Sequence, residues 1–213
     1  MALLLFFSCG FPRNEIHDPA AKLPVHKKPM EAPLESYDID RQREILQAAR
    51  DGIFRFWDDA EIPAQPPPGT NEGLAIRLLV RGKDRGCLSW YKKSGDMKLF
   101  AAYCAVQALH DPRYEPVRPE EAEDTILELT IFGAWEDMPN PQDFSPGYHN
   151  LWLAEGVHNT ILQASLVPQR NYTKEDFLEA ICVKAGLDKN AWKENVILKW
   201  RRSPGLWYTE PLK

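Results

Sequence analysis

The sequence contains few cysteines, and their spacing does not suit a structural metal site or a redox dithiol. Its four cysteines are Cys9, Cys87, Cys104 and Cys182. None of them forms a C-x-x-C pair, and the five histidines form no H-E-x-x-H or H-x-H string. His149 and His158, across an expected loop and strand, are the alternative metal pair. We expect no metal and no cofactor.

Excess positive charge is also absent. The chain has 26 Lys and Arg against 31 Asp and Glu, a formal net charge of −5. A domain that binds duplex nucleic acid usually has a basic face, whereas acids and bases interleave here apart from short clusters such as Lys199, Arg201 and Arg202. Nucleic acid is therefore not an expected partner.

The first ten residues, MALLLFFSCG, carry a short apolar run that ends in a cysteine. Phe6–Cys9 resembles a relaxed bacterial lipobox, in which the cysteine becomes the diacylated N terminus. No basic residue precedes Cys9, as a secretory signal requires, so an unprocessed cytoplasmic protein is the alternative. We expect residues 1–9 to be a signal remnant, Cys9 to be lipidated, and the protein to be a membrane-anchored lipoprotein of the periplasm or outer surface. No other stretch approaches the 18 apolar residues of a transmembrane helix.

Prolines separate this segment from the rest of the chain. Of 18 prolines, five are spread over residues 11–36, where they oppose a helix or a central strand. We expect residues 10–37 to be an extended linker and residues 38–213 to form one domain.

Periodicity within residues 38–213 predicts helices and strands in an α+β order. Helices are expected from Asp38–Asp40 to Phe56, over 99–109, over 173–185 and after Asp188. Strands are expected over 74–80, 85–90, 125–132, 151–154, 157–162 and 196–200. Loops are expected over 61–70 and 135–148. The first two strands should pair as a hairpin through a turn at residues 82–84. Arg85, Cys87 and Ser89 then share one face as a polar row.

Four strings in this order resemble the AMMECR domain family. They are Gly73–Cys87 (GLAIRLLVRGKDRGC), Asp111–Val117 (DPRYEPV), Glu128–Ile131 (ELTI) and Phe177–Trp192 (FLEAICVKAGLDKNAW). Arg85, Gly86 and Cys87 match the family's Leu-Arg-Gly-Cys-Ile-Gly string. Asp84 stands at its leucine, Leu88 at its isoleucine and Ser89 at its last glycine.

The resemblance implies an α+β fold of two closely packed lobes around mainly antiparallel sheets, and no firmly assigned activity. It suggests a Memo-like protein and a radical SAM protein as partners, because prokaryotic relatives are often encoded beside them. We expect a binding or accessory protein with a ligand or partner groove near Arg85-Gly86-Cys87. The alternative is an enzyme that uses Cys87 as nucleophile or redox thiol.

The candidate site residues each have a second interpretation. Arg85 either lowers the pKa of the Cys87 thiol or holds an anionic ligand, or else it pairs with Asp111 or Glu128. A catalytic thiol also needs a base, for which His110, His149 and His158 are the candidates. Without one, Cys87 is a packing residue.

Several other residues also have two interpretations. Arg113 either joins Arg85 at an anion site or belongs with Asp111 to a proline-locked turn. Asp124 and Glu128 form either an acid–base pair or solvated charge at a strand entry. The remaining candidates are expected to pack: Cys104 and Cys182 in helices, and Trp200, Trp207 and Tyr208 by pinning the C-terminal segment rather than forming a ligand platform.

Overall fold

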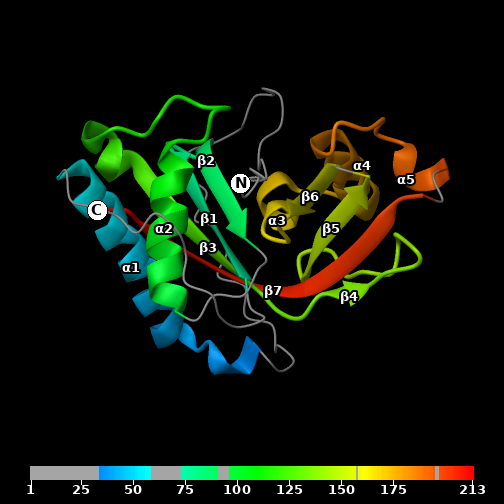
Figure 1. The fold of residues 1–213 in the computed structure, drawn as a ribbon, viewed down its shortest axis with the longest axis horizontal. Coiled ribbons are helices and arrows are strands. Elements are labelled where there is room, and N and C mark those ends of the chain that lie inside the picture. The colour runs from blue at the N-terminus through cyan, green and yellow to red at the C-terminus, as the bar shows by residue number, and fades with distance from the viewer. Residues whose placement is uncertain (1–33, 59–72, 91–95, 157, 195–196) are drawn as a thin grey trace.

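The computed structural model describes residues 34–58, 73–90, 96–156, 158–194 and 197–213, which form two lobes joined by one long strand (Figure 1). The sheet has the strand order β2-β1-β3-β7-β5-β6, with β4 (Glu136–Asp137) also paired to β7, and every pairing is antiparallel. β7 (Lys199–Pro211) pairs with β3 through its second half and with β5 through its first, so it runs from one lobe into the other. This confirms the expected α+β fold of two packed lobes.

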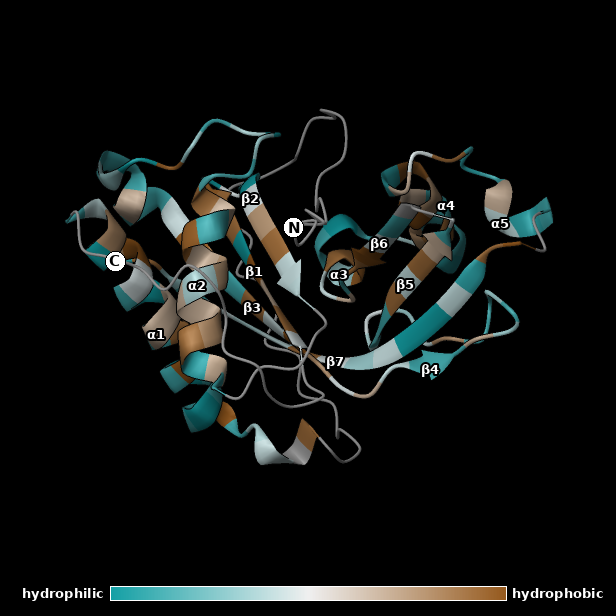
Figure 2. Cartoon of the chain, in the orientation of Figure 1, coloured by the Kyte–Doolittle hydropathy of each residue, from teal (hydrophilic) through white to brown (hydrophobic). Residues whose placement is uncertain are grey.

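In the first lobe, α1 (Ile39–Trp57) and α2 (Met97–Leu109) pack on β1 (Gly73–Val80), β2 (Lys83–Trp90) and β3 (Thr125–Phe132). The chain between α2 and β3 includes the short 3-10 helix η2 (Pro119–Asp124). The apolar residues of α1, α2 and β1 are gathered here, whereas β4 and the part of β7 beside it are hydrophilic (Figure 2). The larger hydrophobic core therefore lies between the two helices and the sheet.

Local sequence signals begin the two long helices. The Asp38 carboxylate accepts a hydrogen bond from the Arg41 backbone N–H at 2.9 Å, as the sequence predicted. Asp96 caps α2 in the same way. The packed part of the chain extends ahead of the expected boundary at residue 38, because Leu34, in the 3-10 helix η1 (Leu34–Ser36), and Tyr37 are buried in the core.

The hairpin of β1 and β2 forms as expected but contains an irregularity. Arg81 and Gly82 form the turn with φ of 51° and 73°, one residue earlier than predicted. The pairing then passes from Leu79↔Asp84 to Leu78↔Gly86, so Arg85 is the extra residue of a β-bulge. The predicted period-two row of Arg85, Cys87 and Ser89 was therefore wrong at Arg85.

The second lobe packs α4 (Lys174–Lys184) and α5 (Ala191–Glu194) against β5 (His149–Glu155) and β6 (His158–Leu162). Thr173 and Asp176 form the predicted capping box of α4, and Gly186 follows it with φ of 78°. The short helix α3 (Leu166–Arg170) was not predicted.

The last strand also differs from the prediction. It begins at Lys199, not near residue 196, and continues to Pro211 as a central strand of the sheet. Trp200, Trp207 and Tyr208 therefore belong to this strand, in which Trp200 and Trp207 are buried. The loop expected over 61–70 lies outside the described residues. In the described part of the chain, no helix has the length and apolar character needed to span a membrane.

Candidate functional site

Arg77 is the centre of a polar cluster on the face of the sheet that points away from α1 and α2. Its neighbours in β1 alternate, so Ile76 and Leu78 enter the main core while Arg77, 5% exposed, faces the second lobe. Arg77 Nε lies 2.6 Å from Asp84 Oδ1, and Nη1 lies 3.4 Å from Glu128 Oε1. Burial lowers the pKa of Arg77, but Asp84 and Glu128 outweigh that effect and raise it.

The same two carboxylates connect the lobes. Ser165 Oγ donates to Glu128 Oε1 at 2.8 Å, and the Gln169 amide donates to Glu128 Oε2. Arg170, at the end of α3, lies 2.5 Å from Asp84 Oδ2. Asp84 thus joins Arg77 of the first lobe to Arg170 of the second.

Cys87 and Ser89 form the floor of the cluster beside Arg77. They are 5% and 1% exposed, and Cys87 pairs with Arg77 across the hairpin. Gln163 Nε2, just after β6, donates to Ser89 Oγ at 2.9 Å and lies 3.5 Å from Cys87 Sγ. The two edge strands of the sheet, β2 and β6, thus meet at a seam between the lobes.

Asp111 lies beside β2 and accepts a hydrogen bond from its backbone. Its carboxylate, 6% exposed, accepts from the Cys87 backbone N–H at 3.1 Å and from Arg113 Nε at 2.9 Å. It also accepts from the Arg113 backbone N–H, which is the proline-locked turn predicted from the sequence. The structure therefore brings Asp111 and Arg113 to the cluster.

Three side chains near the cluster, which we call the rim, are partly exposed: Arg113, Tyr114 and Lys184. Arg113 Nη1 donates to the Tyr114 hydroxyl at 3.4 Å. Lys184, in the last turn of α4, donates to the Ile161 carbonyl of β6. Burial, with Arg113 next in effect, lowers the pKa of Lys184 well below its usual value. Two arginines and two carboxylates act on this amine, so the charge around it is mixed.

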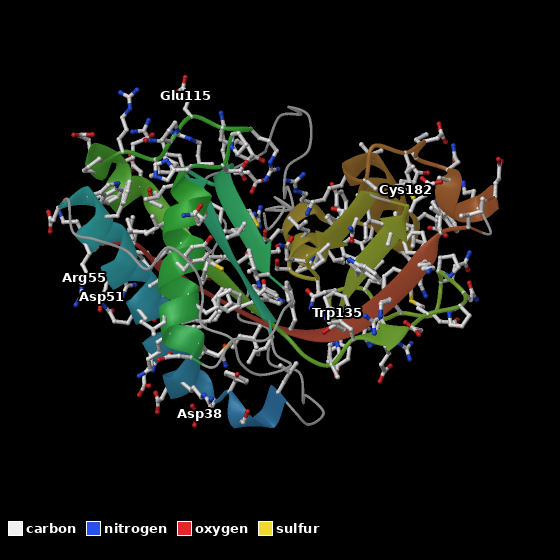
Figure 3. All side chains as sticks on the ribbon, in the orientation of Figure 1. Asp38, Asp51, Arg55, Glu115, Trp135 and Cys182 are labelled. Carbon is white, nitrogen blue, oxygen red and sulfur yellow. The ribbon has the colours of Figure 1, made fainter. Side chains whose placement is uncertain are left out.

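Arg85 lies outside this arrangement because of the bulge. Its guanidinium pairs with Glu121 of η2 at 2.8 Å and donates to the carbonyls of Glu115 and Pro116. Figure 3 shows Glu115 at the end of the first lobe, on the loop that follows α2. The carboxylate partner of Arg85 is thus Glu121, not Asp111 or Glu128 as the sequence suggested, and the Arg85 hydrogen bond lowers the pKa of Glu121.

Gly86 has a packing role. A Cβ atom built there would lie 2.0 Å from the Ala108 carbonyl oxygen of α2. The residue faces the helical core, whereas its neighbour Cys87 faces the seam. The close approach of α2 accounts for the glycine without any ligand.

The contacts of two expected bases do not include Cys87. His110 packs edge-on against the Phe56 ring, and His149 Nδ1 accepts from the Ser145 backbone N–H at 2.9 Å. The third candidate, His158, begins β6. The described residues contain no group of three His, Cys, Asp or Glu side chains that could hold a metal.

The remaining candidate residues are two acids, Asp124 and Glu128, and two cysteines, Cys104 and Cys182. Asp124 pairs with Arg81 at the surface, whereas Glu128 is 1% exposed, so the expectation of solvated charge was wrong for Glu128. Cys104 and Cys182 are free and buried, as predicted for packing residues, and burial raises the pKa of Cys182 to about 11.

Sequence reasoning missed Arg77, Gln163 and Lys184. Arg77 left a signal, because a lone arginine interrupts an otherwise apolar strand, Gly73–Val80. The sequence gives no signal for Gln163 or Lys184, because each reaches the seam only through the packing of the second lobe on the first.

Comparisons with known proteins agree with this fold. The AMMECR1 family model matches residues 42–202. A protein of Methanosarcina acetivorans is 31% identical over 140 residues, which cover 63% of this chain and 70% of the relative. One from Aquifex aeolicus is 28% identical, with 71% and 84% covered.

The crystal structure of the uncharacterized protein PH0010 from Pyrococcus horikoshii is similar in fold. It has a TM-score of 0.67 at 22% identity, and the match covers 78% of this chain and 89% of that one. Since the family model matches most of the chain, the protein belongs to the AMMECR1 family.

Proposed function

We propose that this AMMECR1-family chain is a binding or accessory protein whose ligand or partner sits at the seam between the lobes. The observation that supports this is that partly exposed polar side chains and buried, hydrogen-bonded ones belong to the same cluster. Arg113, Tyr114 and Lys184 are partly exposed, while Cys87 and Ser89 are buried and hydrogen-bonded. Such a site offers polar groups from both lobes to one bound molecule.

An enzyme built on Cys87 has less support. A nucleophilic thiol requires a nearby base or a cation that stabilises the thiolate. Arg85, the expected activator, pairs with Glu121, and the contacts of His110 and His149 lie with other residues. Among the described residues, the polar side chains beside the sulfur are Ser89 and Gln163, which are not bases.

A photo-crosslinking amino acid at Tyr114 tests this function in cells that carry the gene. We expect one discrete adduct from position 114 and none from the matched position Lys189, an exposed residue after α4. The adduct should persist in the Cys87→Ala chain, because binding needs no thiol.

Identical adduct patterns at both positions would contradict a site at the seam. Loss of the adduct in Cys87→Ala, with an unchanged unfolding midpoint, would favour the enzyme.

We also propose that a lipidated Cys9 tethers the chain to a membrane. This rests on Phe6–Cys9 and the proline-rich residues 10–37; Cys9 and most of that segment lie outside the described residues. Metabolic labelling with a palmitate analogue should mark the wild type and not the Cys9→Ala variant. An unlabelled wild type would remove the tether and favour a cytoplasmic protein acting with the Memo-like and radical SAM partners that the family suggests.

A further inference from the structure

We propose that a pocket in the second lobe binds a small zwitterion, which is a free amino acid or a short peptide with both an ammonium and a carboxylate group. The proposal goes beyond the function proposed for the seam, because none of the residues that line this pocket belongs to the seam. The two proposals therefore stand or fall separately.

The pocket lies where the loop after β4 meets the start of α4 and the first half of β7, along which β4 runs (Figure 1). Its volume is about 480 Å³, within the range of about 300 to 1,000 Å³ that is usual for small-molecule sites. Met138 and Phe144, which belong to the core of the second lobe, contribute an apolar floor. The polar residues that line the pocket are Asp137, Gln142, Asp143, Ser145, Lys174 and Arg202.

Hydrogen bonds hold the loop that forms one wall of this pocket. The Gln142 backbone N–H donates to Asn140 Oδ1 at 3.1 Å, and Asn140 Nδ2 donates to Asp143 Oδ1 at 3.3 Å. From β7, the Arg202 guanidinium donates to the Asp143 backbone carbonyl. The wall is therefore ordered before any ligand binds, which lowers the entropy cost of binding.

The charged side chains of the pocket differ in whether they are paired. Asp137 and Arg202 are each in an ion pair with a neighbouring residue, at 2.9 Å and 3.3 Å. Within the part of the chain that the structure describes, Lys174 and Asp143 have no oppositely charged group at ion-pair distance, and they do not pair with each other. The pocket therefore presents one positive and one negative group that a zwitterion can match.

Lys174 is held at the pocket by an aromatic ring. Its Nζ lies 4.9 Å from the centre of the Phe144 ring, which packs on Phe177 with a centroid distance of 5.8 Å. Lys174 is also the first residue of α4, where the helix dipole disfavours a positive charge. The stability of α4 thus does not account for this lysine, whereas a ligand carboxylate beside it would offset the unfavourable charge.

Lys174 and Asp143 can also be interpreted as ordinary solvated charges at the surface. Solvated charges would not distinguish a ligand with two opposite charges from a ligand with only one. A zwitterion site requires both charges of the ligand, so a series of ligands that differ only in charge separates the two interpretations.

NMR titration of the ¹⁵N-labelled full chain with L-leucine and with glycyl-leucine tests the proposal. We expect saturable shifts of the backbone amides of Asp143, Phe144 and Lys174, and the tighter of the two ligands distinguishes an amino acid site from a peptide site. The N-acetyl form of that ligand lacks the ammonium, and its amide form lacks the carboxylate. Each should bind roughly tenfold more weakly than the parent, because each loses one charge-assisted contact.

Two variants assign the charges. Lys174→Met should weaken the parent ligand and its N-acetyl form roughly tenfold and leave the amide form unchanged, whereas Asp143→Asn should weaken the parent and the amide form instead. The control Lys189→Met, at an exposed lysine after α4, should change none of them. Absence of saturable shifts with both ligands, or an N-acetyl or amide form that binds as tightly as the parent, overturns the proposal. This comparison of ligands uses the wild type, so it decides even if a variant folds poorly.

Discussion

Replacing Arg77 with methionine is expected to lower the free energy of unfolding by about 3 to 5 kcal/mol, because it leaves Glu128 buried without its cation and removes one of the two cations paired with Asp84. Glu128 is 1% exposed, and the Asp84 side chain is 13% exposed. Methionine keeps most of the length of the arginine stem, so the loss reports charge rather than volume. Urea unfolding at neutral pH, followed by tryptophan fluorescence, measures it.

The matched control is Arg81→Met, four residues further along the same hairpin. Arg81 pairs with Asp124 at the surface, with side chains 75% and 44% exposed, so we expect a loss of at most about 1 kcal/mol. A second variant, Arg77→Met with Glu128→Gln, should recover part of the stability, since it removes the carboxylate charge that Arg77→Met leaves unpaired. Equal losses for Arg77→Met and Arg81→Met would show that the buried cluster does not stabilise the lobes.

Replacing Gly86 with alanine is expected to cost about 3 kcal/mol. The new methyl would lie 2.0 Å from the Ala108 carbonyl oxygen and 2.9 Å from its carbonyl carbon, so β2 and α2 must move apart. The atoms it meets are backbone, which cannot rotate away as a side chain can. Thermal and urea unfolding of the purified chain measure the loss.

Gly82→Asn is the control for this change. Gly82 has φ of 73° in the hairpin turn with nothing within 4 Å of an added Cβ, and asparagine tolerates that conformation. We expect a change within about 0.5 kcal/mol. A Gly86→Ala protein as stable as Gly82→Asn would mean that α2 yields easily, and the glycine would again need a functional explanation.

The consequences for the Arg85-Gly86-Cys87 string follow from these contacts. Gly86 allows α2 to approach β2 closely. Arg85 holds the loop after α2 through its ion pair with Glu121. Of the three residues, only Cys87 faces the seam. The string therefore divides into two packing residues and one residue of the candidate site. The sequence treated all three as one feature because the bulge at Arg85 leaves no signature in it.

Much of the fold was predictable because its signals are local. The caps Asp38 and Thr173 and the residue Gly186 act on the chain within a few positions of themselves. Alternation over residues 125–132 identified β3 with its full bounds. The family strings added the two-lobed arrangement, since they span most of both lobes.

The bulge at Arg85 and the assembly of the site were decided by the tertiary structure. Arg77, Glu128, Gln163 and Lys184 are far apart in the sequence, and they meet because β7 carries the sheet from one lobe into the other until its two edge strands face each other. Periodicity assigns a residue to a face of its own element, but it carries no information on what covers that face. The sequence alone predicted helix caps, apolar faces and one polar row. Packing placed some of those residues in a buried ionic cluster and left others partly exposed beside it, because charge in the interior is stable only where distant partners meet it.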